Sequence, residues 1–410
     1  MRKKFKGLGM INKFKNFVSN YQQSSCYREP LGFGIARVDI APISKKILCA
    51  TYPILNWKEE NLGSYAVFCN SLSKEKILKE NASECVVEID ESFVLKALEF
   101  YTPFLNEAYS NKMAHKNIQV VLELLKALEE NRLKNNNGES LYRLVILFED
   151  KPCESVESAY MKLLALSLGK APLRSLNLEG IFNQLSNVAW SGNKPYELEW
   201  LRTNEVALKM RGNFPNIDFI DKFPRYLMQL IPEFDNIRLL DSSKTRFGAY
   251  LGTGGYTQMP GASYVNFNAG AMGACMNEGR ISSSVVVGEG TDIGGGASVL
   301  GVLSGGNNNP ISIGKNCLLG ANSVTGISLG DGCIVDAGVT ILAGSVVEIE
   351  ENEFKKLLEV NSVLEKHANN LYKGKELSGK NGVHFRSNSQ NGKLIAFRSV
   401  KKIELNQNLH

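Results

Sequence analysis

Apolar residues recur every six positions along the chain between Phe247 and Val347. A glycine often follows the periodic residue, and a small residue often lies four places after it. A period of six matches neither a helix, with about 3.6 residues per turn, nor a strand, with two, so it indicates a repeat architecture. The positions that keep the period are Phe247, Thr253, Met259, Val265 and Ala271; Ile281, Val287, Ile293 and Val299; Ile313 and Leu319; and Leu329, Val335, Ile341 and Val347.

Short parallel strands, three to a coil and one hexad each, would turn every periodic residue toward a common core. The glycines and small residues would then lie where the backbone turns too tightly for a larger side chain. We therefore predict a left-handed parallel β-helix over residues 237–349, although parallel crossovers are otherwise almost always right-handed.

The repeat is interrupted three times. Ten residues separate Ala271 from Ile281, fourteen separate Val299 from Ile313, and ten separate Leu319 from Leu329. The second interruption contains a polar loop of turn residues at 304–310. The first contains an acid, a glycine and a base in succession, Glu278, Gly279 and Arg280. Tolerated slippage of the repeat would also explain the interruptions, but an acid and a base at a corner favour a site.

Alternating strand-like and helical patterns before the repeat predict a mixed α/β domain over residues 1–236. Its first 28 residues are rich in Lys and Arg and contain Gly7 and Gly9, which favours a mobile basic arm. After the repeat we expect residues 350–410 to form a short helix and strand extension, with an amphipathic helix to about Leu371 that caps the β-helix, followed by one or two strands. The other expected strands are 47–52, 66–69, 85–89 and 144–148, and the other expected helices are 118–133, 156–168, 178–188 and 196–210.

Composition narrows the function. The chain has 410 residues, 43% of them apolar, and a formal net charge of +5, which is too small and too dispersed to indicate a nucleic-acid partner. Eight cysteines are scattered without a Cys-x-x-Cys pair, as expected of reduced packing residues in a cytoplasmic protein. No apolar stretch reaches the roughly 18 residues of a membrane span, so we expect no membrane partner.

The four histidines limit the chemistry of the repeats. They are His115, His367, His384 and His410, and none lies within the repeats. A zinc site built from three histidines of the coils is therefore excluded, and so is a histidine base within the coils. The best remaining candidate is Glu278, which could act as a general base on an amine or attack a thioester itself. Arg280 could bind a carboxylate, although a solvated Glu–Arg turn would look the same.

Several longer motifs carry a family resemblance. They include Val265-Asn266-Phe267-Asn268-Ala269-Gly270, Met276-Asn277-Glu278-Gly279-Arg280-Ile281-Ser282 and Asp292-Ile293-Gly294-Gly295-Gly296-Ala297-Ser298, together with 246–249, 303–306, 311–315, 317–322, 376–379 and, more weakly, 180–182, 187–190 and 221–225. These stretches closely resemble tetrahydrodipicolinate N-succinyltransferases, in particular the branch typified by actinobacterial enzymes. The resemblance runs from about residue 155 to residue 389 and does not extend over the first 150 residues.

The resemblance implies an enzyme of lysine and diaminopimelate biosynthesis. Such enzymes move a succinyl group from succinyl-CoA to the amine of tetrahydrodipicolinate, giving N-succinyl-2-amino-6-oxopimelate and CoA. They are homotrimers, with the site between neighbouring β-helices. Glu278 falls on the family's catalytic glutamate. The positions that fall on succinyl-CoA contacts are Arg280, Gly295, Ser298, Ala321, Asp336 (where the family has Glu), Ala337, Gly344, Lys373, Arg386, Ser387, Asn388 and Ser389.

The family's magnesium ligands do not carry over. The stretch 258–263 lacks the acid expected there and Asp241 is out of register, so we predict no metal. We also expect a trimer, since Tyr250, Tyr256, Tyr264 and Phe267 would leave apolar surface on the outer faces of the coils.

Two other functions stay open. An N-acetyltransferase of the same fold would use acetyl-CoA and would need no cation for a succinyl carboxylate. A trimeric scaffold without activity would have no use for the Glu278 and Arg280 pair at a corner.

Overall fold

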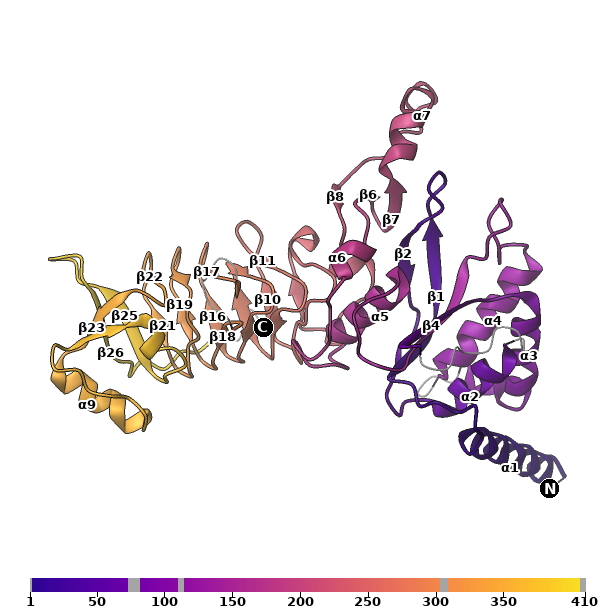
Figure 1. The fold of residues 1–410 in the computed structure, drawn as a ribbon, viewed down its shortest axis with the longest axis horizontal. Coiled ribbons are helices and arrows are strands. Elements are labelled where there is room, and N and C mark those ends of the chain that lie inside the picture. Colours follow the sequence, from indigo (N-terminus) through magenta and orange to yellow (C-terminus); the bar gives the residue numbers. More distant parts are fainter. Residues whose placement is uncertain (1, 73–81, 110–113, 303–308, 406–410) are drawn as a thin grey trace. The chain divides into compact units, whose positions relative to one another are not determined.

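The computed structural model describes residues 2–72, 82–109, 114–302 and 309–405 (Figure 1). The contacts within the chain divide it into two compact units. The first runs to Lys162 and includes Asn177–Lys222, and the second combines Leu163–Leu176 with the chain from Phe223 onward. The predicted boundary at residue 236 therefore differs from the structural one.

Contacts within the second unit explain this difference. The ring of Phe223 stacks on that of Phe267 with 4.6 Å between centroids, so the chain joins the β-helix core well before residue 237. Arg174 donates hydrogen bonds to Ser284 O (2.7 Å) and Ser312 Oγ (3.0 Å), which ties the returning segment to two corners of the coils.

An antiparallel sheet with strand order β2-β1-β5-β4 forms the centre of the first unit, and β3 also pairs with β1. Helices α2, α3 and α4 lie together on one side of it (Figure 1), and their apolar side chains pack with those of the sheet into one core. A smaller sheet, β7-β6-β8, precedes and follows helix α7. The elements are α1 (Arg2–Gln22), β1 (Gly32–Ile40), β2 (Ile47–Thr51), β3 (Asn56–Trp57), α2 (Leu62–Ser71), β4 (Glu84–Glu88), α3 (Glu91–Tyr101), η2 (Thr102–Glu107), α4 (Lys116–Glu129), β5 (Tyr142–Leu147), α5 (Val156–Ser167, which enters the second unit), α6 (Ile181–Gln184), β6 (Val188–Ser191), β7 (Lys194–Glu197), α7 (Leu198–Met210) and β8 (Phe219–Asp221).

Two sequence predictions in this unit are wrong. Residues 66–69, predicted as a strand, lie in α2, because a short apolar run does not distinguish a buried helix from a buried strand. Only Ile181–Gln184 of the predicted helix 178–188 is helical, since Leu185 is extended and β6 begins at Val188.

The basic N-terminal segment also differs from its prediction as a mobile arm, because Arg2–Gln22 form helix α1. Aromatic residues on one face of α1 pack onto the unit: Phe14 contacts Phe104 edge-on at 4.8 Å between centroids, and Phe17 stacks on Phe100 at 4.6 Å. With Tyr21, these residues follow helical spacing along one face. This spacing of aromatic residues could have predicted the helix from the sequence, but the many lysines around it favoured an arm in solvent.

The second unit is a left-handed parallel β-helix whose coils stack three faces of short parallel strands (Figure 1). The first face contains β9 (Arg238–Leu239), β10 (Tyr256–Gln258), β13 (Cys275–Asn277), β16 (Thr291–Ile293), β19 (Leu318–Leu319) and β21 (Ile334–Val335). The second contains β11 (Tyr264–Val265), β14 (Arg280–Ile281), β17 (Ser298–Val299), β20 (Val324–Thr325) and β22 (Thr340–Ile341). The third contains β12 (Gly270–Ala271), β15 (Val286–Val287) and β18 (Ser312–Ile313).

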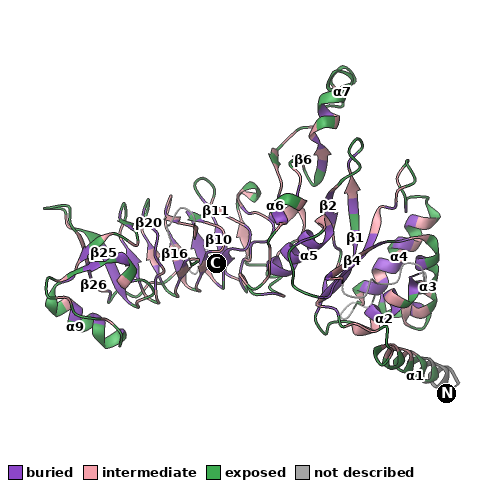
Figure 2. Ribbon diagram, viewed as in Figure 1, coloured by how far each residue is buried: buried purple, intermediate pink, exposed green. Residues whose placement is uncertain are grey.

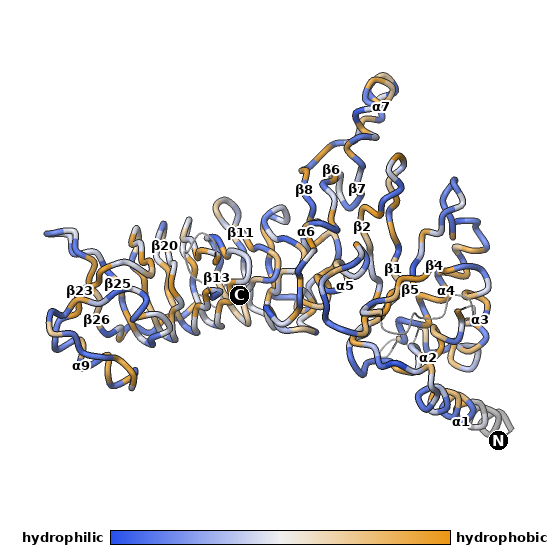
Figure 3. Tube along the Cα trace, in the orientation of Figure 1, coloured by the Kyte–Doolittle hydropathy of each residue, from blue (hydrophilic) through white to orange (hydrophobic). Residues whose placement is uncertain are grey.

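Most of the periodic residues point inward as predicted, and buried positions alternate with half-buried or exposed ones along the coils (Figure 2). The same alternation is visible in hydropathy (Figure 3). Thr253 and Met259 are exceptions, because they are exposed and half-buried, while Tyr256 and Gln258 fill the core of that coil.

The two ten-residue interruptions are each a hexad followed by a corner of four residues. Asn277 pairs in register with Ile293, and Thr325 pairs with Val299 and Ile341, so both polar residues occupy the inward position. Both are fully buried. A search for apolar periodicity misses them, and the repeat therefore continues where the sequence shows a break. The polar loop at 304–310 lies, except for Asn309 and Pro310, outside the described residues.

The C-terminal extension closes the end of the coil core. Phe354 and Leu357 of α9 (Glu351–Val360) are buried in the same cluster as Val347, and Phe354 stacks on Tyr372 at 5.7 Å. The helix ends well before Leu371, since the Asn361 side chain donates to Leu357 O and to Asn381 O. Strand β23 (Val346–Glu348) precedes this helix, and β24 (Leu371–Lys373), β25 (Val383–Ser387) and β26 (Leu394–Arg398) follow it. The unit also contains the 3₁₀ turns η3 (Tyr226–Met228), η4 (Ser242–Lys244) and η5 (Gly374–Glu376).

The apolar surface predicted for the outer faces is smaller than expected. Tyr256 is fully buried inside the coil and Phe267 is 8% exposed beneath Phe223, while Tyr250 and Tyr264 are half-buried. All eight cysteines are unpaired, and Cys275, Cys317 and Cys333 are buried in the coils. Of the helices that the structure describes, none combines the length and the apolarity that crossing a bilayer would require.

Candidate functional site

One edge of the β-helix, between its first and second faces, collects the central predicted site residues. Glu278, Gly295, Ala321 and Ala337 each lie at the corner where successive coils cross this edge, and we call these four corners the Glu278 edge. Backbone hydrogen bonds stack the corners: Gly296 N donates to Glu278 O (3.1 Å), Asn322 N to Gly295 O (2.9 Å) and Gly338 N to Ala321 O (2.9 Å). With about 4.8 Å between neighbouring strands, the three coil steps span about 14 Å.

Glu278 is half-buried at the first of these corners. Its amide donates to Ile293 O (2.8 Å), and its carboxylate lies over Gly295, where a Cβ atom would be 3.4 Å from Glu278 Oε2. Within the described residues, no hydrogen bond or ion pair engages this carboxylate. It is therefore positioned by its backbone and available to a ligand.

Gly279 makes the sharp corner possible. A Cβ atom at this position would lie 2.3 Å from Ala297 O and 2.8 Å from Ile293 Cγ2, so a larger residue would force the corner and the next coil apart. The Gly279 amide donates to Asn277 Oδ1 at 3.0 Å, which closes a turn over Glu278. The glycine is thus required by the close approach of the next coil.

Arg280 and Ser298 lie side by side on the second face. They pair in register on β14 and β17, and Arg280 Nε donates to Ser298 Oγ at 3.1 Å. Arg280 is exposed, and among the contacts of the described residues its side chain uses only Nε, so its terminal nitrogens can bind an anion. The predicted acid and base of the first interruption are therefore two residues apart on either side of one corner.

At the far end of the Glu278 edge, β25 continues the first face beyond β21. Asp336 accepts hydrogen bonds from His384 Nε2 (2.7 Å) and Arg386 Nε (2.5 Å). Burial alone would raise the pKa of the Asp336 carboxyl, but the bonds from Arg386 and His384 outweigh burial and hold that pKa below its usual value. Arg386 also lies over the Phe397 ring at 5.1 Å. The predicted contact of Asp336 with the donor stays a prediction, and the structure adds that Asp336 holds Arg386 in place. His384, which the motifs did not indicate, shares this carboxylate.

The remaining predicted contacts divide between two places. Ser387 ends β25 beside Arg386, and Asn388 shapes the hairpin that follows, since its amide donates to Lys393 O (2.8 Å) and its Oδ1 accepts from Gln390 N (2.9 Å). Ser389 is exposed in that hairpin.

Gly344 and Lys373 lie at the corner after β22, which is the next edge of the prism rather than the Glu278 edge. Lys373 pairs with Val346, next to that corner, and Gly374 N donates to Ser345 O at 2.8 Å. The structure of one chain therefore does not bring these two residues together with Glu278.

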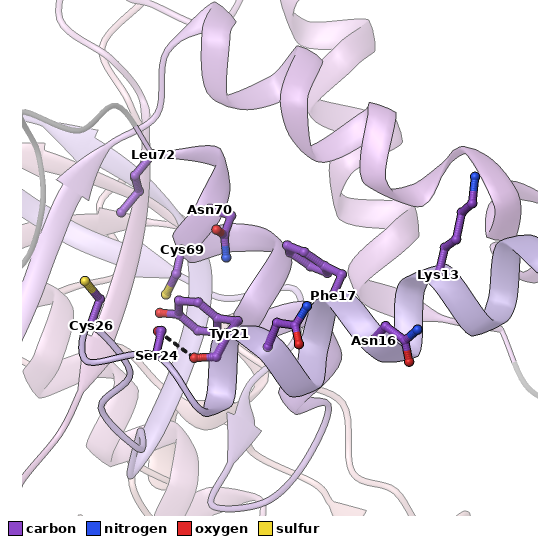
Figure 4. Close-up of a pocket in the computed structure, with 10 residues that line it drawn as sticks. Lys13, Asn16, Phe17, Tyr21, Ser24, Cys26, Cys69, Asn70 and Leu72 are labelled. Atoms are coloured by element: carbon purple, nitrogen blue, oxygen red, sulfur yellow. Dashed lines mark hydrogen bonds between the residues drawn. The ribbon is translucent and has the colours of Figure 1, made fainter.

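No group of three His, Cys, Asp or Glu side chains suited to a metal ion occurs among the described residues. The first unit contains a cavity of about 750 Å³ where α1 meets α2 (Figure 4). Its lining includes Lys13, Phe17, Tyr21 and Cys69, none of which belongs to the predicted site.

A hexapeptide β-helix is typical of acyltransferases of the hexapeptide-repeat class, and the site fits this class, with a corner glutamate that has no partner among the described residues and arginines beside the same edge. Three family profiles agree. Tetrahydrodipicolinate N-succinyltransferase N-terminal matches residues 12–183, its middle domain matches 185–225, and the hexapeptide repeat of succinyl-transferase matches 310–343. The chain belongs to the tetrahydrodipicolinate N-succinyltransferase family. The predicted family and fold are confirmed, and the likeness extends over the first 150 residues, where the motifs gave no sign of it.

Curated relatives cover nearly the whole chain. The 2,3,4,5-tetrahydropyridine-2,6-dicarboxylate N-succinyltransferase of Helicobacter pylori is 94% identical over 98% of this chain and 100% of that protein. The enzyme of that name from Campylobacter jejuni is 49% identical over 98% of this chain and 100% of that protein. A solved Campylobacter jejuni structure assigned as a 2,3,4,5-tetrahydropyridine-2-carboxylate N-succinyltransferase has a TM-score of 0.86 and 48% identity, and the match covers 96% of this chain and 98% of that one.

Proposed function

We propose that this protein transfers the succinyl group of succinyl-CoA to the nitrogen of tetrahydrodipicolinate, giving N-succinyl-2-amino-6-oxopimelate and CoA. One water is consumed, because it adds to the ring C=N carbon and becomes the 6-oxo oxygen when the ring opens and frees the amine. The single observation that carries the proposal is the Glu278 carboxylate, which is half-buried on a rigid corner and has no partner among the described residues. A carboxylate held in this way is suited to proton transfer or to nucleophilic attack. The full-length identity to enzymes named for this reaction supports the same substrates.

In the transfer, the amine nitrogen forms a bond to the thioester carbonyl carbon and the carbon–sulfur bond breaks. The amine loses a proton and the departing CoA sulfur gains one. Glu278 can accept the first proton as a general base and return it to the sulfur. Alternatively its oxygen attacks the thioester, releases CoA and forms a mixed anhydride that the amine then opens.

The Glu278 edge supplies the donor site in this proposal. Gly295, Ala321 and Ala337 present small side chains there, which lets an extended pantetheine arm lie against the backbone. Arg280 would bind the succinyl carboxylate beside Glu278, and Arg386, oriented by Asp336, would bind phosphate groups at the other end. Ser298, Ser387, Asn388 and Ser389 would add polar contacts.

Gly344 and Lys373 can join this donor site only if a neighbouring chain supplies them. A groove between subunits of a homotrimer would do so, and we include a trimer in the proposal. Light scattering at micromolar concentration should give three times the chain mass of 45.2 kDa, and a monomeric mass would remove these two residues from the site.

A donor comparison tests the function. Purified protein with tetrahydrodipicolinate should release CoA from succinyl-CoA, and much more slowly from acetyl-CoA, because only succinyl offers a carboxylate to Arg280. Faster release from acetyl-CoA would identify an acetyltransferase, and no release from either donor would favour a scaffold. Mass spectrometry after incubation with succinyl-CoA alone separates the two routes, since only the anhydride route leaves succinyl on Glu278.

A further inference from the structure

Asn277 occupies a position where the later coils of the β-helix use apolar residues, and where the preceding coil has another polar residue, Gln258. In the later coils of the same inward column, the register places Ile293, Leu319 and Val335, all fully buried. Asn277 is also fully buried. A buried amide without hydrogen bonds costs several kcal/mol by transfer measurements, roughly 2–7, so its partners decide whether it is tolerated.

A chain of buried hydrogen bonds supplies those partners. Asn277 Oδ1 accepts from Gly279 N (3.0 Å), and Asn277 Nδ2 donates to the Tyr256 hydroxyl (3.1 Å). Tyr256 in turn donates to Gln258 Oε1 (2.9 Å), which also accepts from Thr245 Oγ1 (2.7 Å). All four side chains are fully buried. The chain therefore connects the core of the preceding coil with the corner that carries Glu278.

The bond from Gly279 acts on the peptide unit that joins Glu278 to Gly279. The Glu278 carbonyl in that unit accepts from Gly296 N (3.1 Å), and the amide donates to Asn277. Together with the bond from Glu278 N to Ile293 O, these contacts hold the glutamate backbone on both sides of its Cα atom. Without Asn277, the peptide that follows Glu278 keeps one hydrogen bond instead of two.

In the part of the chain that the structure describes, the other four-residue corner turns the coil without a buried side chain that binds its backbone amide. Thr325 is the inward residue before the other shortened corner, and it is also fully buried. Its hydroxyl has no hydrogen-bond partner among the described residues. A short corner therefore does not require a buried side chain that binds its backbone amide. The hydrogen bond from Gly279 N to Asn277 occurs at the corner that carries the reactive carboxylate.

We propose that Asn277 is a positioning residue for the transfer reaction: anchored by Tyr256, it holds the Gly279 amide and thereby fixes the direction of the Glu278 side chain. The inference rests on the proposed function, because it assumes that Glu278 takes part in the reaction. A displacement of about 1 Å at a reacting group can lower the rate about 100-fold.

The test uses an isosteric pair in the full-length protein. In Asn277→Val the amide of Gly279 loses its acceptor, whereas in Asn277→Thr a hydroxyl can still accept from it, although more weakly. We expect kcat of the Val variant to fall at least about tenfold with the KM for succinyl-CoA within about twofold, and the Thr variant to keep at least about three times the kcat of the Val variant. Thr325→Val removes a buried hydroxyl from the other corner and should leave kcat unchanged.

Tyr256→Phe gives a second measurement if the Val variant does not fold. It removes the acceptor for Asn277 Nδ2 but leaves the bond to Gly279, so kcat should fall below that of the wild type, by less than about tenfold, with the KM for succinyl-CoA within about twofold. An unchanged kcat would mean that the anchor at Tyr256 does not matter and would overturn the inference. Equal kcat values for the Thr and Val variants, or a tenfold fall in Thr325→Val, would overturn the inference.

A double variant separates this inference from the proposed function. If Asn277 acts through Glu278, adding Asn277→Val to Glu278→Gln should not lower the residual kcat further. An additional tenfold loss would mean that Asn277 acts independently, and the inference would be wrong even though Glu278 is catalytic. Near-normal kcat in Glu278→Gln alone would instead remove the proposed function.

Discussion

Gly279→Ala perturbs the corner beneath Glu278 without changing any reacting group. The new Cβ atom would lie 2.3 Å from Ala297 O, whereas real contacts of this kind are essentially never shorter than 3.0 Å, so the corner and the next coil must separate by at least about 0.7 Å. Overpacking of this kind typically destabilises a protein by about 1–3 kcal/mol, which a β-helix of this size should survive. A displacement approaching 1 Å at the reacting carboxylate predicts a fall in kcat of about 100-fold.

Steady-state kinetics with succinyl-CoA and tetrahydrodipicolinate, together with thermal unfolding, measure both effects. Gly9→Ala is a matched control, because a Cβ atom there meets nothing within 4 Å on the surface of α1. It should leave kcat unchanged and slightly favour the helix. A folded Gly279→Ala protein with kcat within twofold of the wild type would refute the claim that the corner must hold Glu278 so closely.

Three further predictions concern other contacts. Arg280→Ala should raise the KM for succinyl-CoA about ten- to hundredfold, since a charge-assisted hydrogen bond contributes about 1.5–3 kcal/mol, and an unchanged KM would place the donor elsewhere. Lys162→Met should lower the midpoint of thermal unfolding, because the fully buried ammonium donates to Asp150 (2.8 Å) and Asn177 O (2.7 Å), and hydrogen bonds from a charged group contribute about 1.5–3 kcal/mol each. An unchanged midpoint would contradict this. Asp336→Asn should lower the midpoint above about pH 4, the ordinary range of an Asp pKa. The difference from the wild type should then disappear as the pH falls through the lowered pKa of Asp336, and a difference that persists at lower pH would argue against the contacts with Arg386 and His384 as its cause.

The hexad pattern predicted the β-helix because the core of each coil accepts one side chain per face. It did so even though Asn277 and Thr325 interrupt the apolar sequence, since the flanking strands keep the register. What it could not supply was the reason for the interruptions. A polar inward residue is visible in a sequence only as a missing apolar one, and its hydrogen bonds depend on Tyr256 in the preceding coil.

The candidate site was partly accessible from the sequence. The motifs placed Glu278 and Arg280 together, and the coils stack Gly295, Ala321 and Ala337 behind them. The bond between Asp336 and Arg386 was not predictable, because β25 joins the first face only after β22, β23, α9 and β24, some 50 residues later in the chain.

The first unit gave fewer signals. Its central strand β1 was missed because Gly32 and Gly34 interrupt the apolar alternation. These glycines make room for aromatic rings of Trp57 and Tyr52, which lie 2.5 and 3.2 Å from where a Cβ atom would be. These contacts explain why glycines occur in a central strand, although the local sequence is typical of a turn.

Turnover of Glu278→Gln is the most direct test of the account. Glutamine keeps the size of the side chain and one oxygen but can neither accept the proton of the amine nor form an anhydride. With the donor site intact, kcat for succinyl transfer should fall by at least about 100-fold while the KM for succinyl-CoA changes little. Thermal unfolding should match that of the wild type, since this carboxylate forms no hydrogen bond or ion pair within the described residues. A kcat close to the wild-type value would contradict both catalytic routes and reduce the corner to a structural turn.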